Sequence, residues 1–536
     1  MSIRKQRGQA LILIALAFVG LAAFIGLAVD AGILFIQYGH LRRAVDAASL
    51  SAANQFREGW TPAEMTAAGL QVLALNGLDP TSIGVAVETC DTATIPGDPA
   101  LCMTAPATPR KLVRVTGSVT AHFAFLPIIG IYSAPLSANA ISEAASTDIV
   151  LVIDSSESMA FDAGCDDAAT DGNKDDDAWA ETNLLPGATL ADPPIYCSGC
   201  GAPDGVADDG CGGATPPMVG LFPDNYMRDP AHCNSPEKQC RPFRDVQDAA
   251  TALTTRLLPP YDRMAIVTFD LNAVVQKNLN YQAAAGLSNA AYLTALNGQI
   301  MALDVYNSPG CQGWIDADDP TGCTSTNTAG GLLQAGGQFG AFKREEAVWI
   351  VILLSDGGAN AAQDESTPPN WICPGSPGAA NWIQPFCRDP IASTRHTSAD
   401  SDYDPDDAAR DRADWVGCLD SNTPASEQHG GCAALAPNYG QGAVIFTIGL
   451  GDRLTEDDNC DWGASCEPDV GEQMLRYFAA VGDDGDPTTD PCKPPSPAPE
   501  APVGTDCGNY YFSPHGSDLL EVFEAIASRI FTRITH

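Results

Sequence analysis

Three stretches of the chain place oxygen-bearing side chains at close spacing beside an apolar run or a helical pattern. In the first, Asp154, Ser156 and Ser158 follow the apolar run of DIVLVIDSSES. In the second, TSTNTAGGLL, Thr326 precedes a helical pattern, and in the third, VILLSDGG, Asp356 follows an apolar run. Carboxylate and hydroxyl oxygens are the ligands that hard divalent cations prefer. Asp and Ser are also common in turns, so spacing alone leaves both a metal site and plain turns open.

The runs that precede Asp154 and Asp356 have the composition of buried parallel strands. Apolar, β-rich runs recur with helical patterns between them, at 148–153, 263–269, 347–354, 443–449 and 509–513. This alternation predicts a parallel sheet covered on both faces, with 274–280 as an antiparallel edge strand. Ligands of such sheets bind beyond the carboxyl ends of the strands. Two carboxylates and three hydroxyls at one edge would suit an octahedral cation such as Mg²⁺, with one position open.

The order of these motifs resembles that of the von Willebrand factor A domain and its metal-ion-dependent adhesion site. The shared motifs are D-x-S-x-S after a first strand, T-x-T-x-x-G-L before a helix, and an apolar strand ending in S-D-G. The resemblance spans residues 147–536 with gaps. It implies a doubly wound, mostly parallel α/β fold, with Mg²⁺ or Mn²⁺ taking a carboxylate from a protein partner. It implies five metal ligands: Asp154, Ser156, Ser158, Thr326 and Asp356.

Four segments interrupt the matched sequence, at 161–240, 304–325, 358–440 and 484–506. The first three leave the sheet at its carboxyl edge and are expected to surround the metal. They contain 12 of the 18 cysteines. In domains of this family the loops around the metal select the ligand, and these loops are unusually long.

Two acidic runs have spacing similar to that of calcium-binding loops. DSDYDPDDAARD places acids at alternate positions and at its twelfth, namely Asp400, Asp402, Asp404, Asp406 and Asp411. DGNKDDD offers a weaker set, namely Asp171, Asn173, Asp175 and Asp177. The alternative for both runs is an acidic, solvated loop without a metal.

The 18 cysteines, the first at position 90, indicate an oxidising compartment and a set of disulfides. Because short loops close at low entropic cost, we expect neighbours to pair: Cys90–Cys102, Cys311–Cys323, Cys373–Cys387, Cys418–Cys432, Cys460–Cys466 and Cys492–Cys507. The six cysteines between 165 and 240 allow fifteen pairings. Among them, Cys197 and Cys200 have zinc-site spacing, but disulfides are favoured outside the cell.

The N-terminus has the pattern of a membrane anchor. Arg4, Lys5 and Arg7 precede Ala10–Val29, which carries no charge and is long enough to cross the hydrocarbon core as a helix. The basic cluster predicts a cytoplasmic N-terminus and an extracytoplasmic main body. A cleaved signal peptide is the alternative. The further apolar sequence AGILFIQ after Asp30 favours an uncleaved single span.

The same segment resembles the N-terminal part of the TadE/TadG-like proteins of Flp (Tad) pilus assembly. The matching features are Arg7 with Gly8, the AVDAG motif at the membrane exit, and LRRAVDAASLSAA with Asp46. Pilin-like members carry Glu five residues after the processing glycine, where this chain has Leu13. The resemblance therefore implies the TadG-like branch, an anchor followed by a large outer domain.

Three domains are expected: an anchor and helix at 1–57, a small β-rich spacer module at 58–146, and the α/β domain at 147–536. The module contains the strand patterns IGVAVETC and KLVRVTGSVTAHFAFL. The alanines at helical spacing in the outer part of the first helix would let another helix approach closely. Alternatively they form a good helix without a partner.

The charge and the absence of common catalytic motifs in the sequence exclude several classes of function. With 28 basic and 67 acidic residues the net charge is −39, which excludes a basic nucleic-acid footprint. The sequence contains no H-E-x-x-H, G-x-S-x-G or G-x-x-x-x-G-K motif, so we expect no enzyme; a hydrolase within the cysteine-rich loops is the third alternative.

We expect a pilus-assembly or surface-adhesion protein that binds its partner through the cation. The alternative is a structural component of a pilus or secretion assembly, in which the metal only stabilises the domain.

Overall fold

The chain folds into two compact units, Met1–Ser146 and Thr147–His536, in the computed structural model. The structure describes residues 9–57, 61–79, 82–102, 109–156, 159, 243–305, 326–344, 346–363, 382–383, 386–387, 395–398, 400–418, 440–451, 454–455, 470–486, 489–494 and 498–533.

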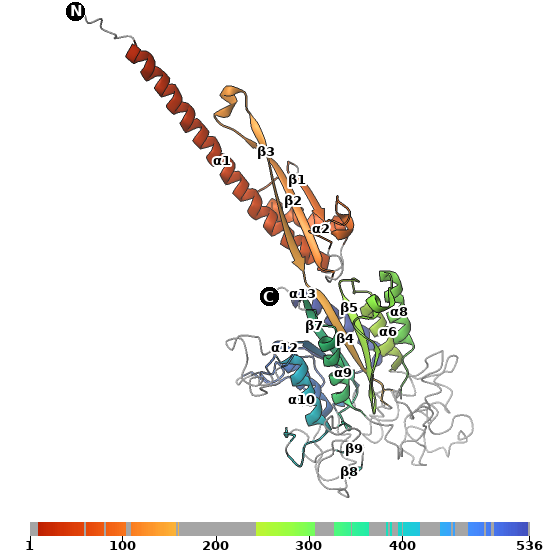
Figure 1. Ribbon diagram of the computed structural model, residues 1–536. Helices are drawn as coiled ribbons and strands as arrows, with labels where there is room; N and C mark the ends of the chain where they lie inside the picture. The colour runs from red at the N-terminus through yellow and green to blue at the C-terminus, as the bar shows by residue number, and fades with distance from the viewer. Residues whose placement is uncertain are drawn as a thin grey trace, which may run out of the picture. The chain divides into compact units, whose positions relative to one another are not determined.

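The first unit combines a long helix with a small sheet (Figure 1). The long helix α1, Gln9–Arg57, is followed by α2, Pro62–Leu75. The sheet has the antiparallel order β1-β2-β3. Its strands are β1, Gly84–Glu88; β2, Lys111–His122; and β3, Ser133–Ala144, with the short 3₁₀ helices η1, Cys90–Thr92, and η2, Leu126–Ile129. Strands β1 and β2 match the predicted strand patterns, whereas β3, which is rich in Ala and Ser, was not predicted.

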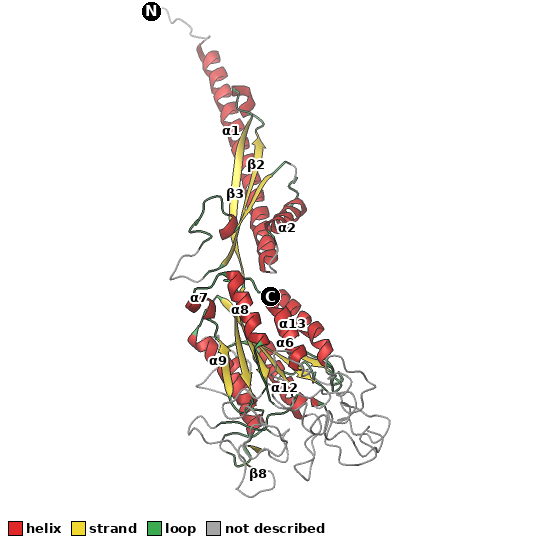
Figure 2. Ribbon diagram, turned by 90° about the vertical axis from the view of Figure 1, so that its right-hand side faces the viewer, coloured by secondary structure: helices red, strands yellow, loops and turns green. Residues whose placement is uncertain are grey.

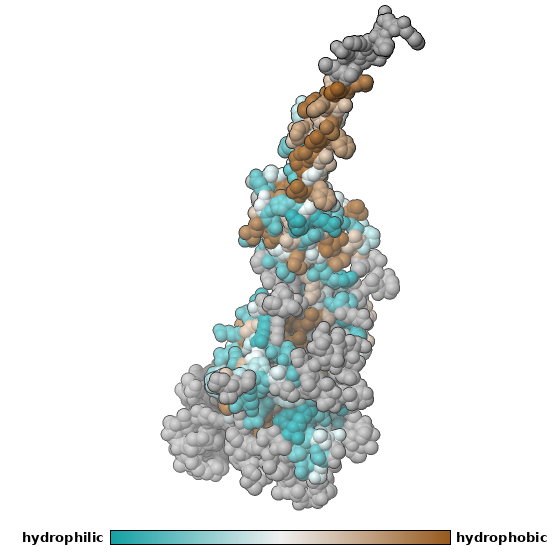
Figure 3. Space-filling view, turned by 90° about the vertical axis from the view of Figure 1, so that its left-hand side faces the viewer, coloured by the Kyte–Doolittle hydropathy of each residue, from teal (hydrophilic) through white to brown (hydrophobic). Residues whose placement is uncertain are grey.

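Helix α1 has two parts with different surroundings. Its N-terminal part exposes large apolar side chains, seen as brown atoms in Figure 3, and is long and apolar enough to span a membrane. In its C-terminal part Leu41, Ala44, Ala48 and Ala52 are buried, because α1 packs there on α2, β2 and β3. The small side chains therefore serve close packing within this unit.

The second unit is built on a six-stranded sheet with the order β11-β10-β7-β4-β5-β6. Figure 2 draws strands in yellow and the helices of this unit in red. Its strands are β4, Ser146–Asp154; β5, Arg263–Phe269; β6, Ala273–Lys277; β7, Ala347–Ser355; β10, Val444–Leu450; and β11, Tyr510–Ser513. The pairs β10 with β11, β10 with β7 and β4 with β5 are parallel, whereas β5 with β6 is antiparallel. The expected α/β sheet with an antiparallel edge strand is confirmed. A separate short hairpin pairs β8, Trp382–Ile383, with β9, Phe386–Cys387.

Helices cover both faces of this sheet. Alternate residues of β4 point to opposite faces, so Leu151 packs with α6, α8 and α13, while Val152 packs with α9, α10 and α12. These helices, with the short α7 and η6, have the bounds α6, Phe243–Thr254; α7, Tyr281–Ala285; α8, Asn289–Met301; α9, Thr328–Ala341; α10, Pro405–Gly417; α12, Val470–Asp484; η6, Gly516–Asp518; and α13, Leu519–Arg533. The expected insertion 358–440 therefore contains a core helix, α10.

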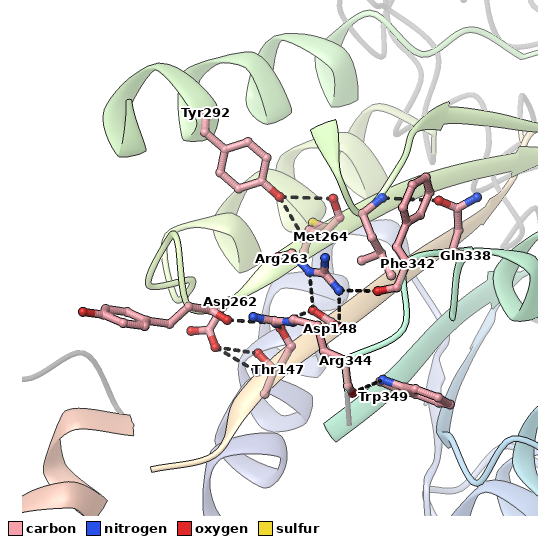
Figure 4. Close-up of polar contacts among 12 residues, drawn as sticks. Thr147, Asp148, Asp262, Arg263, Met264, Tyr292, Gln338, Phe342, Arg344 and Trp349 are labelled. Carbon is pink, nitrogen blue, oxygen red and sulfur yellow. Dashed lines mark hydrogen bonds and ion pairs between the residues drawn. The ribbon is translucent and has the colours of Figure 1, made fainter. Parts of the chain in front are cut away.

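A buried polar cluster fixes the amino ends of the central strands (Figure 4). The Asp148 carboxylate accepts hydrogen bonds from Arg263 Nε and Nη2 at 2.8 and 2.6 Å, and it also pairs with Arg344. Asp262 accepts 3.0 Å hydrogen bonds from the backbone N–H and hydroxyl of Thr147. These bonds connect the start of β4 to β5 and to the segment before β7, at the edge opposite the predicted metal ligands.

Two of the six predicted neighbour pairings are present as disulfides, Cys90–Cys102 and Cys492–Cys507. Cys418 is also disulfide-bonded. The remaining predicted pairs, which include cysteines outside the described residues or without a described side chain, stay predictions.

Candidate metal centre

Asp154 lies at the carboxyl end of β4, the strand between β7 and β5, and is fully buried. Its Oδ1 accepts a 2.9 Å hydrogen bond from the backbone N–H of Ser156, and its Oδ2 accepts a 2.6 Å bond from Ser355 Oγ. Ser355 is the last residue of β7. The carboxylate is thus held between the tips of two neighbouring parallel strands, where the sequence predicted the site.

A second buried carboxylate, Asp356, follows β7 directly. Burial raises the pKa of Asp154 to about 8, and the negative charge of Asp356 adds to this effect, although hydrogen bonds from Ser156 and Ser355 oppose it. When two acids are buried close together, the simultaneous ionisation of both is strongly unfavourable unless a cation neutralises their charges. The electrostatics therefore favour either a bound proton or a bound divalent cation.

Thr326 is held against the loop that follows β7. Its backbone N–H donates to Asn360 Oδ1 at 2.7 Å, and the Asn360 N–H donates back to the Thr326 carbonyl at 3.2 Å. The next residue, Asn327, caps α9 by accepting a 2.9 Å bond from the Gly330 N–H, and its side-chain amide donates to the Leu271 carbonyl at 3.0 Å. These bonds tie the second predicted motif, which contains Thr326, to the loops after β7 and β5.

Gly331, the glycine of the T-x-T-x-x-G motif, lies where there is no room for a side chain. A Cβ at this position would lie 2.8 Å from Phe269 Cδ1 and 3.0 Å from Val152 Cγ1. The missing side chain lets the first turns of α9 approach β4 and β5 closely, which places Thr326 at the sheet edge. Sequence reasoning identified the motif but missed Ser355 and Asn360, whose roles depend on contacts between distant segments.

The structure places four of the five predicted ligands, Asp154, Ser156, Thr326 and Asp356, at the carboxyl edge of the sheet, each almost fully buried. Ser158 lies outside the described residues. Buried carboxylate and hydroxyl oxygens are suitable ligands for a hard divalent cation. A positive charge here would also stabilise the ionised form of Asp154, which burial and Asp356 disfavour.

A second acidic cluster lies at the start of α10. Ligand oxygens of Asp404, Asp406 and Asp407 lie within 4.8 Å of one another, and all three residues are buried. Asp404 caps the helix, accepting bonds from the Asp406 and Asp407 N–H groups at 3.1 and 3.2 Å. Arg410 Nη1 lies 2.6 Å from Asp406 Oδ2, and His396 contacts Asp407. A cation is therefore already supplied to this cluster by the chain itself.

The first acidic run differs from the calcium-loop pattern that its spacing predicted. The helix begins at Pro405, the sixth position of the twelve, so the run is half loop and half helix. Asp400 accepts bonds from Thr397, and Asp411 pairs with Arg395 and Tyr403. Asp402 is exposed. Asp407, absent from the predicted set, joins Asp404 and Asp406. The second run, Asp171, Asn173, Asp175 and Asp177, lies outside the described residues.

No family model matches the chain, and no curated protein matches it. Among solved structures, the chain is similar to proximal thread matrix protein 1 from the mussel byssus, at 10% identity and a TM-score of 0.29, covering 72% of this chain and 47% of that chain. It is similar to the pilus adhesin SpaC from Lactobacillus rhamnosus GG, at 13% identity and a TM-score of 0.33, covering 81% and 35%. It is also similar to the vWF domain of the type V pili tip protein Mfa5 from Porphyromonas gingivalis, at 14% identity and a TM-score of 0.31, covering 73% and 97%. The chain spans less than half the length of the first two structures. Likenesses at this level are partial matches in shape, and the case for the site rests on its own geometry.

Proposed function

We propose that this chain is a membrane-anchored, outward-facing protein that binds a protein partner through a divalent cation at the carboxyl edge of its sheet. One observation carries the proposal: two buried carboxylates, Asp154 and Asp356, occupy neighbouring strand ends, and burial together with the Asp356 charge raises the pKa of Asp154 to about 8. A cation at this place would relieve that electrostatic cost.

Each side chain has a distinct part in this proposal. Asp154 and Asp356 supply negative charge, while Ser156, Ser158 and Thr326 supply neutral oxygens. Mg²⁺ or Mn²⁺ bound there would accept a carboxylate oxygen from an Asp or Glu of the partner. Ser355 and Asn360 position the ligands, since they hold Asp154 and Thr326 in place. The proposed function is binding and includes no catalytic reaction.

The anchoring part of the proposal is supported by α1, which is long and apolar enough to span a membrane. The basic residues Arg4, Lys5 and Arg7 favour a cytoplasmic N-terminus. The disulfides Cys90–Cys102 and Cys492–Cys507 favour an extracytoplasmic main body. A role in Flp (Tad) pilus assembly, as a TadG-like protein, is proposed from the resemblance of the N-terminal segment.

A structural role for the metal is the second candidate. The hydrogen bonds of Asp154 join the ends of β4 and β7, so a cation there would also stiffen the sheet edge. In that case the protein would serve as a component of a pilus or secretion assembly without a cation-mediated partner.

Water relaxation around bound Mn²⁺ separates the two candidates. The full chain in lipid nanodiscs is loaded with Mn²⁺, and a peptide containing one Glu is added, with the Gln peptide as control. We expect the Glu peptide to displace metal-bound water and lower the relaxation enhancement. If Mn²⁺ raises the melting temperature but neither peptide changes the relaxation, the adhesion proposal is wrong and the structural role stands.

A further inference from the structure

The hairpin that joins β2 to β3 ends in an exposed apolar tip, residues 125–132. The exposed fractions are 45% for Phe125, 83% for Ile128, 70% for Ile129, 48% for Ile131 and 67% for Tyr132. Residues 123–142 include no charged side chain. Hairpin turns at a water-exposed surface are usually built from Gly, Asn, Asp and Ser, so the sequence LPIIGIY is unusual for a solvated tip.

The tip is a folded feature with its own hydrogen bonds. The Phe123 N–H donates to the Tyr132 carbonyl at 3.0 Å, and the Ile131 N–H donates to the Leu126 carbonyl at 3.1 Å. Between them, η2 ends at Ile129 and is capped by Gly130, whose positive φ of 89° is a conformation that suits glycine. The isoleucines are therefore displayed by a defined backbone.

Asp30 of α1 holds this tip against the helix. Its buried carboxylate accepts backbone bonds from Ala124 and Leu126, each at 2.7 Å, and from Phe125 at 3.1 and 3.2 Å. These bonds satisfy a carboxylate that lies next to a long apolar stretch, where an unsatisfied charge would be costly. They also fix the height of the tip along α1.

That height is close to Asp30, the first charged residue after the uncharged stretch Ala10–Val29 of α1. A Cβ on Gly26 would lie 3.0 Å from Phe125 Cβ, so the absence of a side chain lets Phe125 pack on the helix. Gly26 lies three residues before Val29, or about 4.5 Å along the helix axis. The tip is thus continuous with the exposed apolar surface of α1 seen in Figure 3.

We infer that residues 125–132 insert into the boundary between lipid headgroups and acyl chains, beside the point where α1 leaves the membrane. Interfacial amphipathic helices bury their apolar faces about 5–10 Å deep in that boundary, and we expect a comparable depth for this tip. Tyr132 has the amphipathic ring that is enriched there. The inference rests on the proposed anchoring by α1, and it gives the first unit a second membrane contact that would restrict rotation of the unit about α1.

Quenching by brominated lipids tests this contact on the full chain. The chain is reconstituted in nanodiscs whose phosphatidylcholine is brominated near the headgroup end of the acyl chains. The variant Ile128→Trp is compared with Leu75→Trp, which adds Trp at an equally exposed apolar position at the end of α2. Because the chain already has eight tryptophans, the emission of each added Trp is the difference from the parent chain.

We expect the added Trp at position 128 to lose about half of its emission or more, and the one at position 75 to keep its emission. Ile129→Trp repeats the measurement in case one substitution disturbs the tip. Equal quenching at positions 128 and 75 would overturn the inference. A blue-shifted but unquenched Trp at position 128 would also overturn it, by showing that protein covers the tip.

An alkaline wash of the native membranes separates the insertion of the tip from the anchoring by α1. A chain that is retained but has an unquenched tip refutes only the insertion of the tip, whereas a released chain refutes both proposals.

Discussion

At the residue scale, Asp154 is the residue on which the proposed cation site depends most. The carboxylate sits at the end of an entirely buried strand, receives hydrogen bonds from Ser156 and Ser355, and lies near the acid Asp356. Burial is the largest cause of its raised pKa, ahead of the Asp356 charge. The residue type and its place after a strand were readable from the sequence. The hydrogen bond from Ser355 could not be predicted, because Ser355 is 201 residues away along the chain.

The raised pKa of Asp154 predicts a pH dependence of metal binding. Without a cation, Asp154 stays protonated in the folded chain over the pH range in which the unfolded chain has already lost this proton. That range runs from the unfolded pKa of about 4 to the folded pKa of about 8. The stability contributed by this proton is present below the unfolded pKa and is lost as the pH rises through the folded pKa. A cation replaces that proton, so Mg²⁺ should raise the melting temperature more at pH 8 than at pH 5. Scanning calorimetry of the full chain, with and without Mg²⁺, measures this.

Asp154→Asn is the control, because it removes the titrating group with little change of shape. In this variant the difference between the Mg²⁺ effects at the two pH values should vanish. An equal Mg²⁺ effect at pH 5 and pH 8 in the unmodified chain would contradict this account of the electrostatics.

A second buried charge, Asp148, predicts a loss of stability when it is removed. Asp148→Ala leaves Arg263 and Arg344 close together without their shared carboxylate, and should lower the free energy of unfolding by about 3–5 kcal/mol. Asp248→Ala breaks the partly exposed Arg244–Asp248 pair on α6 and should cost about 0.5 kcal/mol or less. Urea unfolding of both variants checks the contrast, and similar losses in the two would argue against a special role for the Asp148 cluster.

At the scale of elements, the strands that end in the site were predictable because continuous apolar runs have few alternatives to burial in a parallel sheet. Two elements were harder to predict. Strand β3 alternates small and polar residues without a clear apolar face. Helix α10 begins in an acidic run that has the spacing of a metal loop, and only its packing on α9 and α12 shows that it belongs to the covering layer.

The close approach of α9 to the sheet predicts the effect of adding one methyl group. Gly331→Ala would place a Cβ within 3.0 Å of Phe269 and Val152 and should cost about 1–3 kcal/mol of unfolding free energy through overpacking. Since Thr326 precedes this helix, cation affinity should also fall. Gly337→Ala, in the same helix with open space around it, should be neutral or stabilising by up to about 1 kcal/mol. Thermal unfolding and a Mg²⁺ titration of both variants provide the measurement, and equal effects would show that the close approach is unimportant.

At the scale of the whole molecule, the chain combines an apolar N-terminal helix with a strongly acidic overall composition, 67 acidic against 28 basic residues. The sequence predicted the long apolar N-terminal helix, the α/β sheet and the sheet edge where the candidate ligands lie, because each depends on local composition and on the edge that parallel strands share. The use of the alanine-rich part of α1 could not be predicted. Small side chains on a helix can pack against another chain, face solvent or pack against their own unit. Which of these occurs depends on how residues far along the sequence fold.

The central claim, that the sheet edge binds a cation through Asp154, is tested most directly by calorimetric titration of the full chain with Mg²⁺ or Mn²⁺. Asp154→Ala should abolish one binding site and leave the circular dichroism spectrum unchanged, because the residue ends a strand and takes no part in the apolar core. Asp248→Ala removes an equal charge from the surface of α6 and should bind the cation as the unmodified chain does. If Asp154→Ala folds normally and still binds the cation with unchanged affinity and stoichiometry, the proposed metal site is wrong.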